Sequence, residues 1–147
     1  MILQIAETTT FHCLKSAPPE PLGPKSFKQT DTDTVDQEEE AWYLCRTCHQ
    51  QITRPSHQIQ IQGDHRHTFA NPSGAVFDIG CFASAEGFSF MGPPSTEFTW
   101  FSGYSWRITI CASCLNHIGW FFSSSGDSFF GFIVDQLILR SLPKSNL

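Results

Sequence analysis

The sequence predicts an all-β fold built from antiparallel strands. From about Trp42 onward, the 147-residue chain is rich in aromatic and β-branched residues, and turn-forming residues interrupt it at short intervals. Short strand-like segments separated by frequent turns are typical of antiparallel sheets. Apart from two Cys-x-x-Cys pairs, no internal repeat is visible in the sequence.

Six segments carry strand patterns. Residues 58–62 and 106–110 alternate between polar and apolar residues with a period of two. The other four are short apolar or aromatic runs, at 75–79, 98–101, 119–122 and 130–139. Expected turns, marked by Gly, Pro, Asn or Ser, lie at 63–64, 71–74, 92–94, 102–103 and 123–127. Within the last strand candidate, residues 132–139 are also compatible with a helix.

The N-terminal part of the chain differs in composition. Residues 1–40 hold eight acidic residues and three lysines, whereas residues 41–147 hold six acidic and six basic residues. Prolines and mutually repelling carboxylates bury too little apolar surface to offset the entropy of ordering a chain. We therefore expect a disordered acidic tail at 1–41, a folded domain at 42–140 and a C-terminal tail at 141–147. A docking role for the acidic tail is the alternative to a solvated extension.

Charge and hydropathy argue against two kinds of partner. The folded part is neutral and lacks the clustered Lys and Arg that nucleic-acid binding needs. No apolar run approaches the roughly 20 residues that span a bilayer. The apolar opening at 1–6 is short, lacks basic residues and is a poor signal peptide. We expect a cytoplasmic monomer without nucleic-acid or membrane partners.

The two cysteine pairs predict a metal site. Cys45 and Cys48 form the first pair, Cys111 and Cys114 form the second, and 62 residues separate them. Two intervening residues let both thiolates of a pair reach one ion at about 2.3 Å. Two such pairs complete a tetrahedral shell with no open position, which predicts one structural Zn²⁺. A redox dithiol or disulfides are the alternatives, and the spacing without an export signal favours zinc.

Three other residues of metal-binding type need an interpretation. His49 and His117 lie beside the cysteine pairs and could replace a cysteine, but four cysteines already complete the shell. Cys81 lies in an apolar run, so we expect a small core residue there.

Three of the four tryptophans, Trp100, Trp106 and Trp120, fall within 21 residues around the second cysteine pair. A core seldom needs three such rings in one corner, because each indole N–H must find a partner. The cluster predicts an aromatic box for a small planar ligand, with simple core filling as the alternative. Three neighbouring aromatic residues are expected to be packing or surface residues: Phe101, Tyr104 and Phe121.

Several blocks of residues follow the order and spacing of a known family. They are Cys45-x-x-Cys48, Asn71-Pro72-x-Gly74, Gly92-Pro93-x-Ser95-x-Glu97, Trp100-Phe101-x-Gly103-Tyr104-x-Trp106, Cys111-x-x-Cys114 and His117-Ile118-Gly119-Trp120-x-Phe122. From about Leu44 to Leu139 the chain thus resembles the thalidomide-binding (CULT) domain family of cereblon.

The resemblance implies a β-tent fold, in which two antiparallel sheets meet at an angle near a zinc ion held by four cysteines. It also implies a ligand cage of Trp100, Trp106 and Trp120, with Phe122 as the fourth wall. The ligand would be a cyclic imide of the glutarimide or thalidomide type, a uracil-like heterocycle such as uridine, or the C-terminal cyclic imide of a damaged protein.

The resemblance assigns further roles to four residues around this cage. The Phe98 carbonyl would accept the imide N–H, and the Trp100 N–H would donate to an imide carbonyl. Thr99 is the residue between them in the implied ligand-binding set, and Asn71 would steady the loop over the site.

The sequence departs from the family at two points, and these limit which family properties we expect of this chain. Phe98 stands where vertebrate cereblon has a histidine, which removes a side-chain hydrogen bond but leaves main-chain recognition, as in stand-alone bacterial members. The 44 residues before Cys45 are too few for the Lon-like domain that docks cereblon onto its ubiquitin-ligase adaptor. We therefore expect a single-domain, bacterial-type relative, without support for a ligase-receptor role.

Methionine sulfoxide reductase B is the nearest enzyme class, because it shares a tent-like fold and two zinc-binding cysteine pairs. That enzyme needs a reactive cysteine on a later strand, and this chain has no cysteine after Cys114. Cys81 has no basic neighbour in the sequence to lower its pKa. We therefore expect no enzymatic activity. A zinc-supported protein-interaction module without a small ligand is the other alternative.

Overall fold

The computed structural model describes residues 38–145. The expectations for the acidic tail therefore lie almost entirely outside the described residues. The first described strand, β1, begins at Glu39, and the last, β9, ends at Pro143. No helix in the described part is long and apolar enough to cross a membrane.

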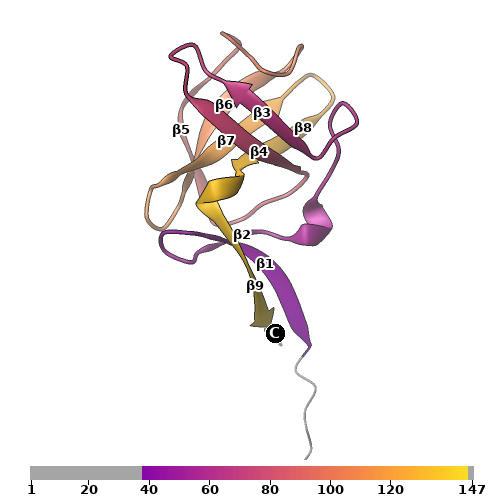
Figure 1. Cartoon of the computed structure of the whole chain (residues 1–147), viewed down its shortest axis with the longest axis vertical. Coiled ribbons are helices and arrows are strands. Elements are labelled where there is room, and N and C mark those ends of the chain that lie inside the picture. The colour runs from indigo at the N-terminus through magenta and orange to yellow at the C-terminus, as the bar shows by residue number, and fades with distance from the viewer. Residues whose placement is uncertain (1–37, 146–147) are drawn as a thin grey trace, which may run out of the picture. The chain divides into compact units, whose positions relative to one another are not determined.

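The strands form two antiparallel sheets (Figure 1). The smaller sheet has the order β2 (Gln51–Thr53), β1 (Glu39–Cys45), β9 (Leu137–Pro143). The larger sheet has the order β3 (Arg66–Ala70), β4 (Val76–Phe82), β8 (Ser128–Ile133), β7 (His117–Ser123), β6 (Ser105–Cys111), β5 (Phe88–Ser95). Two 3-10 turns complete the described elements, η1 (Pro55–His57) and η2 (Val134–Gln136). The predicted all-β class with two antiparallel sheets is confirmed.

The two faces of the larger sheet pack into separate apolar clusters. On β7, Ile118 and Phe121 contact a cluster that includes Ile52 of β2 and Leu137 of β9. This face is therefore covered by the smaller sheet. Trp120 and Phe122, the two neighbours of Phe121, point to the opposite face, because successive side chains of a strand alternate. Ile118 lies two residues before Trp120 but packs on the other face, because the β6–β7 register shifts between Thr109 and Ile110 and leaves Ile118 as an extra residue in β7. This bulge and the alternation after it separate the sheet–sheet core from the tryptophan cluster.

Most of the predicted strands are present. Residues 76–79 of the segment predicted at 75–79 lie in β4, residues 106–110 lie in β6, and residues 119–122 lie in β7. The segment 130–139 splits into β8 and β9 around the three-residue turn η2. The helical alternative for residues 132–139 is therefore wrong.

The strand predicted at residues 58–62 is wrong. Only single bridges form there, one of them between Gln58 and Phe82. The chain then reverses at Gln62 and Gly63, whose φ angles are 53° and 89°. This left-handed turn ends the extended segment after a few residues, although the polar–apolar alternation continues through it.

Two predictions near the tryptophans are also wrong. Residues 98–101 form a loop instead of a strand, and Phe98 at its start has a left-handed φ of 52°. The turn expected at 92–94 lies inside β5, where the pairing register with β6 jumps between Met91 and Ser95. Because β5 is an edge strand, it tolerates prolines at such an irregularity.

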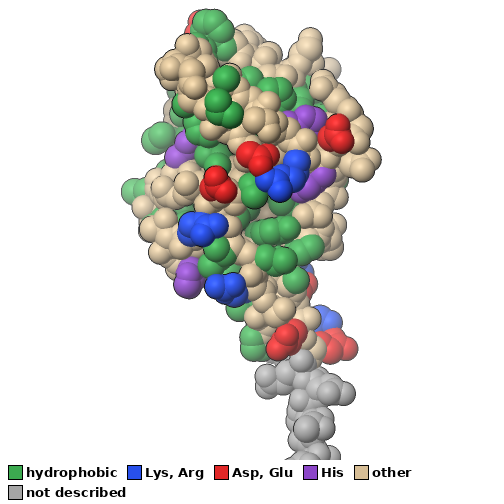
Figure 2. Space-filling model, viewed as in Figure 1, with side chains coloured by type: hydrophobic (Ala, Val, Ile, Leu, Met, Phe, Trp, Pro, Cys, Tyr) green, Lys and Arg blue, Asp and Glu red, His purple; other side chains and the backbone are tan. Residues whose placement is uncertain are grey.

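Acidic and basic side chains are interspersed on the face of the molecule that Figure 2 shows. Three ion pairs join such side chains: Arg54–Glu40, Arg66–Asp78 and Lys144–Glu38. This mixed surface fits the balanced charge of the folded part.

Candidate functional site

The two Cys-x-x-Cys pairs adopt the same backbone conformation. His49 N–H donates to the Cys45 carbonyl at 2.8 Å, and Leu115 N–H donates to the Cys111 carbonyl at 2.9 Å. His49 and Leu115 are both left-handed, with φ angles of 62° and 65°. A left-handed residue directly after the second cysteine reverses the chain and closes a tight turn around each pair of sulfurs.

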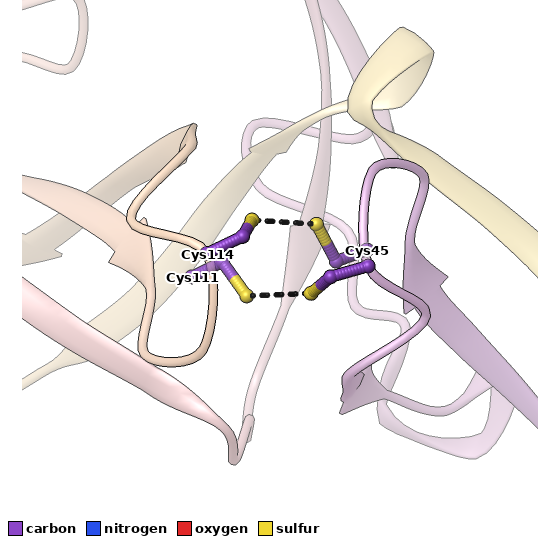
Figure 3. A group of neighbouring side chains, drawn as sticks. Cys45, Cys111 and Cys114 are labelled. Carbon is purple, nitrogen blue, oxygen red and sulfur yellow. Dashed lines mark hydrogen bonds between the residues drawn. The ribbon is translucent and has the colours of Figure 1, made fainter.

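The turns come from different sheets and bring the four sulfurs together (Figure 3). Cys45 ends β1 and Cys111 ends β6, and all four Sγ atoms lie within 4.8 Å of one another. The Cys45–Cys114 and Cys48–Cys111 Sγ distances are 3.7 and 3.5 Å. A disulfide would need about 2.05 Å. Sulfurs at about 2.3 Å from a tetrahedral ion would be about 3.8 Å apart. The four residues therefore fit a metal ion that joins the two sheets.

The thiols of this cluster differ in their environment. Cys45 and Cys111 are completely buried, whereas Cys48 is exposed. A backbone hydrogen bond at Gln50 lowers the pKa of Cys48 to about 7. Burial raises the pKa of Cys111 to about 12. Ionising the buried thiol is therefore costly, and a bound cation would offset that cost.

The histidines beside the cysteine pairs do not belong to the cluster. It consists of Cys45, Cys48, Cys111 and Cys114, while the Nε2 atom of His117 lies 2.9 Å from the Gly119 carbonyl oxygen. Cys81 is completely buried, and burial raises its pKa to about 12. Cys81 is therefore a core residue, which fits packing and not nucleophilic chemistry.

A second site is an apolar cavity on the face of the larger sheet that the tryptophans occupy. Its volume is about 450 Å³. The lining residues are Asn71, Pro72, Phe77, Glu97, Phe98, Trp100, Trp106, Ile108, His117, Trp120 and Phe122. Six of the seven residues expected at a ligand site thus line one cavity, and Thr99 does not.

Cross-strand pairing of β6 and β7 builds one wall of the cavity. Trp106 pairs with Phe122, and Ile108 pairs with Trp120. Residues two apart on a strand share a face, so these four side chains stand side by side. Trp120 and Phe122 are 9% and 1% exposed, and they form the buried floor.

Trp100 is placed by contacts with β3 and β7. Its ring stacks on Phe69 at 5.0 Å with an interplanar angle of 13°. It also meets Trp120 edge to face at 4.7 Å and 71°. The Trp100 Nε1–H donates to the Ala70 carbonyl at 3.1 Å. The indole is therefore held between two strands, and its donor already has a backbone partner.

Hydrogen bonds fix the loop between β5 and β6. Trp106 Nε1–H donates to the Glu97 carbonyl at 2.8 Å, and Glu97 N–H donates to Ser95 Oγ at 3.1 Å. The Thr99 hydroxyl donates to the Phe101 carbonyl at 3.1 Å, and Phe101 is completely buried. The Thr99 side chain thus stabilises the loop from outside the cavity.

Phe98 has an unusual conformation at the edge of the cavity. Its φ is 52°, and its side chain is 75% exposed. Among the described residues, none donates a hydrogen bond to its carbonyl. The left-handed conformation costs an apolar residue free energy, which is a reason to look for a function there.

Asn71 organises the turn between β3 and β4. Its Oδ1 accepts hydrogen bonds from Ser73 Oγ at 2.7 Å and from the Ala75 N–H at 2.9 Å. The Asn71 and Ala75 backbones are joined by a further hydrogen bond of 2.9 Å. The side-chain oxygen is therefore engaged, and the amide nitrogen is the group left for other partners.

Sequence reasoning missed several residues of the cavity. Ile108 lies two residues from Trp106 on a predicted strand, so the period-two pattern could have identified it. Phe77 meets Trp120 edge to face at 5.0 Å, and His117 does so at 4.7 Å. Burial lowers the pKa of His117. The strand order brings Phe77 of β4 near Trp120, and the register shift in β7 puts His117 on the same face as Trp120, three residues later.

No protein-family model matches this chain. Individual proteins named cereblon are similar to it. Cereblon of Drosophila grimshawi is 36% identical over 93 residues, which are 58% of this chain and 13% of that protein. Cereblon of Drosophila virilis is 35% identical over 99 residues, 63% of this chain and 15% of that protein. Cereblon of Drosophila melanogaster is 30% identical over 95 residues, 58% of this chain and 15% of that protein.

The chain spans 13–15% of the length of these three relatives. The similarity therefore concerns a segment of cereblon and not the whole protein. Two antiparallel sheets and four clustered cysteines agree with the fold expected for that segment. The chain is therefore similar, in sequence and in these structural features, to one segment of cereblon.

Proposed function

We propose that this domain binds a cyclic imide of the glutarimide type or a uracil-like heterocycle in the aromatic cavity. The observation that carries the proposal is the cavity of about 450 Å³, with three indoles and Phe122 in its lining. Phe98 lies at its edge, and its carbonyl accepts no hydrogen bond from another described residue. Small-ligand sites are typically concave, mostly apolar and equipped with a few polar groups that fix orientation.

The size of the cavity suits a single ring. Ligand pockets commonly have volumes of about 300–1,000 Å³. Glutarimide has roughly eight heavy atoms, and efficiencies between about −0.3 and −1.5 kcal/mol per atom bound its binding free energy at about −2 to −12 kcal/mol. A dissociation constant of about 1 μM, which corresponds to about −8.2 kcal/mol, lies inside this range.

The polar edge of an imide has complementary groups around the cavity. Its N–H would donate to the Phe98 carbonyl, which has no other donor among the described residues. The Asn71 amide nitrogen and the Trp100 N–H are donors for the imide carbonyls. The Trp100 N–H lies 3.1 Å from the Ala70 carbonyl, so a ligand would have to share or replace this hydrogen bond. A C-terminal cyclic imide of a protein presents the same edge.

We further propose that the metal is one structural Zn²⁺. Four cysteine sulfurs within 4.8 Å of one another suit the tetrahedral shell that zinc prefers, and such a shell would leave no open position for a substrate. Reduced thiols of this kind are typical of the cytoplasm. The domain would act there as a monomeric, non-enzymatic binding module, in the manner of single-domain bacterial-type relatives.

Titration of the tryptophan fluorescence with glutarimide and uridine tests the ligand proposal. The response should saturate in the wild type and disappear in Trp106→Ala, which removes one cavity wall. Trp42→Phe is the matched control, because Trp42 is buried in β1 and does not line the cavity. N-methylglutarimide, which lacks the N–H donor, should bind at least about tenfold more weakly, about 1.4 kcal/mol.

Absence of a saturable response up to millimolar ligand in metal-loaded protein would overturn the ligand proposal. Equal binding of glutarimide and its N-methyl derivative would overturn only the proposed role of the Phe98 carbonyl and would leave the rest of the ligand proposal intact.

A further inference from the structure

The aromatic cavity has an acidic residue and neither lysine nor arginine in its lining. Glu97 is the charged residue there, since neither Lys nor Arg lines the cavity. None of the ion pairs among the described residues involves Glu97. Burial lowers the pKa of His117, the other titratable residue of the lining, and so favours its neutral form. The cavity therefore carries a net negative charge.

The backbone of Glu97 is fixed beside the indole of Trp106. Its carbonyl accepts the Trp106 Nε1–H at 2.8 Å, and its N–H donates to Ser95 Oγ at 3.1 Å. Its carboxylate makes no hydrogen bond or ion pair with another described residue. The imide proposal leaves this carboxylate without a role, because a neutral imide offers it no positive charge.

The tryptophan walls and the Glu97 carboxylate both favour a positively charged ligand. The faces of aromatic rings carry negative potential, and indole attracts cations most strongly. Three tryptophans and three phenylalanines line this cavity. A quaternary ammonium group suits such walls, because its methyl groups pack against rings and it has no N–H that must be satisfied. Aromatic cages that recognise choline and methylated lysine work in this way.

We propose that the cavity also binds a quaternary ammonium group, with its methyl groups against the indoles and its charge opposite the Glu97 carboxylate. This inference uses the cavity of the proposed function but none of the imide hydrogen bonds. The two proposals can therefore fail independently.

Isothermal titration with choline tests the inference. The control ligand is 3,3-dimethylbutan-1-ol, which has carbon in place of the charged nitrogen and nearly the same shape. At constant ionic strength, choline should bind at least about tenfold more tightly than the neutral alcohol. Glu97→Gln should weaken choline binding several-fold. Glu86→Gln removes the same charge at an exposed position outside the cavity and should not.

A second pair of ligands distinguishes a free cation from a protein side chain. A peptide with trimethyllysine is compared with the same peptide carrying unmodified lysine. Preference for the trimethylated peptide assigns the site to a modified side chain, and choline binding without that preference assigns it to a free small cation.

Equal affinity for choline and the neutral alcohol would overturn the inference. So would equal weakening by Glu97→Gln and Glu86→Gln, because the charge effect would then be non-specific. If glutarimide binds and choline does not, this inference alone fails. If choline binds and glutarimide does not, the inference holds and the imide proposal fails.

Discussion

The position of the cavity floor depends on residue 131 being a glycine, because there is no room for a Cβ atom there. A Cβ atom at this position would lie 2.8 Å from Phe122 Cε2 and 2.9 Å from Ile79 Cδ1. Ordinary contacts between carbon atoms are about 3.5–4.0 Å. In Gly131→Ala, the Phe122 ring would therefore have to move by roughly 0.7 Å or more, since Ile79 closes the other side. Phe122 is 1% exposed, so it has little free space to move into.

The expected loss of stability follows from two opposing terms. Overpacking a close-packed core costs about 1–3 kcal/mol. Replacing glycine by alanine within a strand recovers about 0.5–1 kcal/mol of backbone entropy. We expect Gly131→Ala to lose about 1–2 kcal/mol of unfolding free energy in urea denaturation. Ligand affinity should also fall, because Phe122 forms part of the cavity floor.

Gly126→Ala is the matched control for this experiment. No atom lies within 4 Å of a Cβ built at Gly126, so its unfolding free energy should change by less than about 0.5 kcal/mol. If Gly131→Ala is as stable as Gly126→Ala, the close packing around Phe122 does not set the position of the floor.

Three further predictions concern the metal, a buried thiol and the loop. Purified protein should contain one zinc per chain. Cys111→Ser or removal of the metal by a chelator should lower the unfolding temperature, because structural zinc contributes on the order of 10 kcal/mol to folding in peptide-scale sites. Protein that is folded without metal would contradict this prediction. Cys81 should resist iodoacetamide at pH 8 in the folded protein and react in urea, because burial raises its pKa to about 12 and keeps the thiol protonated. Rapid labelling of Cys81 in the folded protein would refute this prediction. Trp106→Phe should cost about 1 kcal/mol of unfolding free energy, because it removes the 2.8 Å hydrogen bond to the Glu97 carbonyl. The measurement is urea denaturation, with Trp42→Phe as the control. Full wild-type stability of Trp106→Phe would show that this hydrogen bond does not hold the loop.

The cysteine cluster could be predicted from the sequence because its geometry is local. Each pair needs only two intervening residues and a left-handed residue to form its turn, and His49 and Leu115 supply that residue. The 62-residue separation carries no information about distance in space. Only the chemistry of four sulfurs indicated that the two turns meet.

The cavity could be predicted only in part, because half of it depends on pairing between strands. The predicted strands at 106–110 and 119–122 place their alternate residues correctly. Phe77 reaches Trp120 because β4 lies beyond β8 in the sheet, which no local pattern reveals. The loop at 98–101 was misread as a strand for a related reason. Aromatic residues favour strands, but hydrogen bonds of the neighbouring residues Glu97 and Thr99 fix the loop in which Phe98 is left-handed.

The metal cluster and the cavity are mechanically connected through one hairpin. β6 carries Trp106 and ends at Cys111, and β7 begins three residues after Cys114 and carries Trp120. The cluster therefore closes the end of the hairpin whose face forms a cavity wall, and it ties this end to β1 through Cys45. The wall needs both strands in one register, since a slip by one residue would turn its side chains to the other face. Metal loss removes this constraint at the hairpin end, so ligand affinity should fall before the larger sheet unfolds.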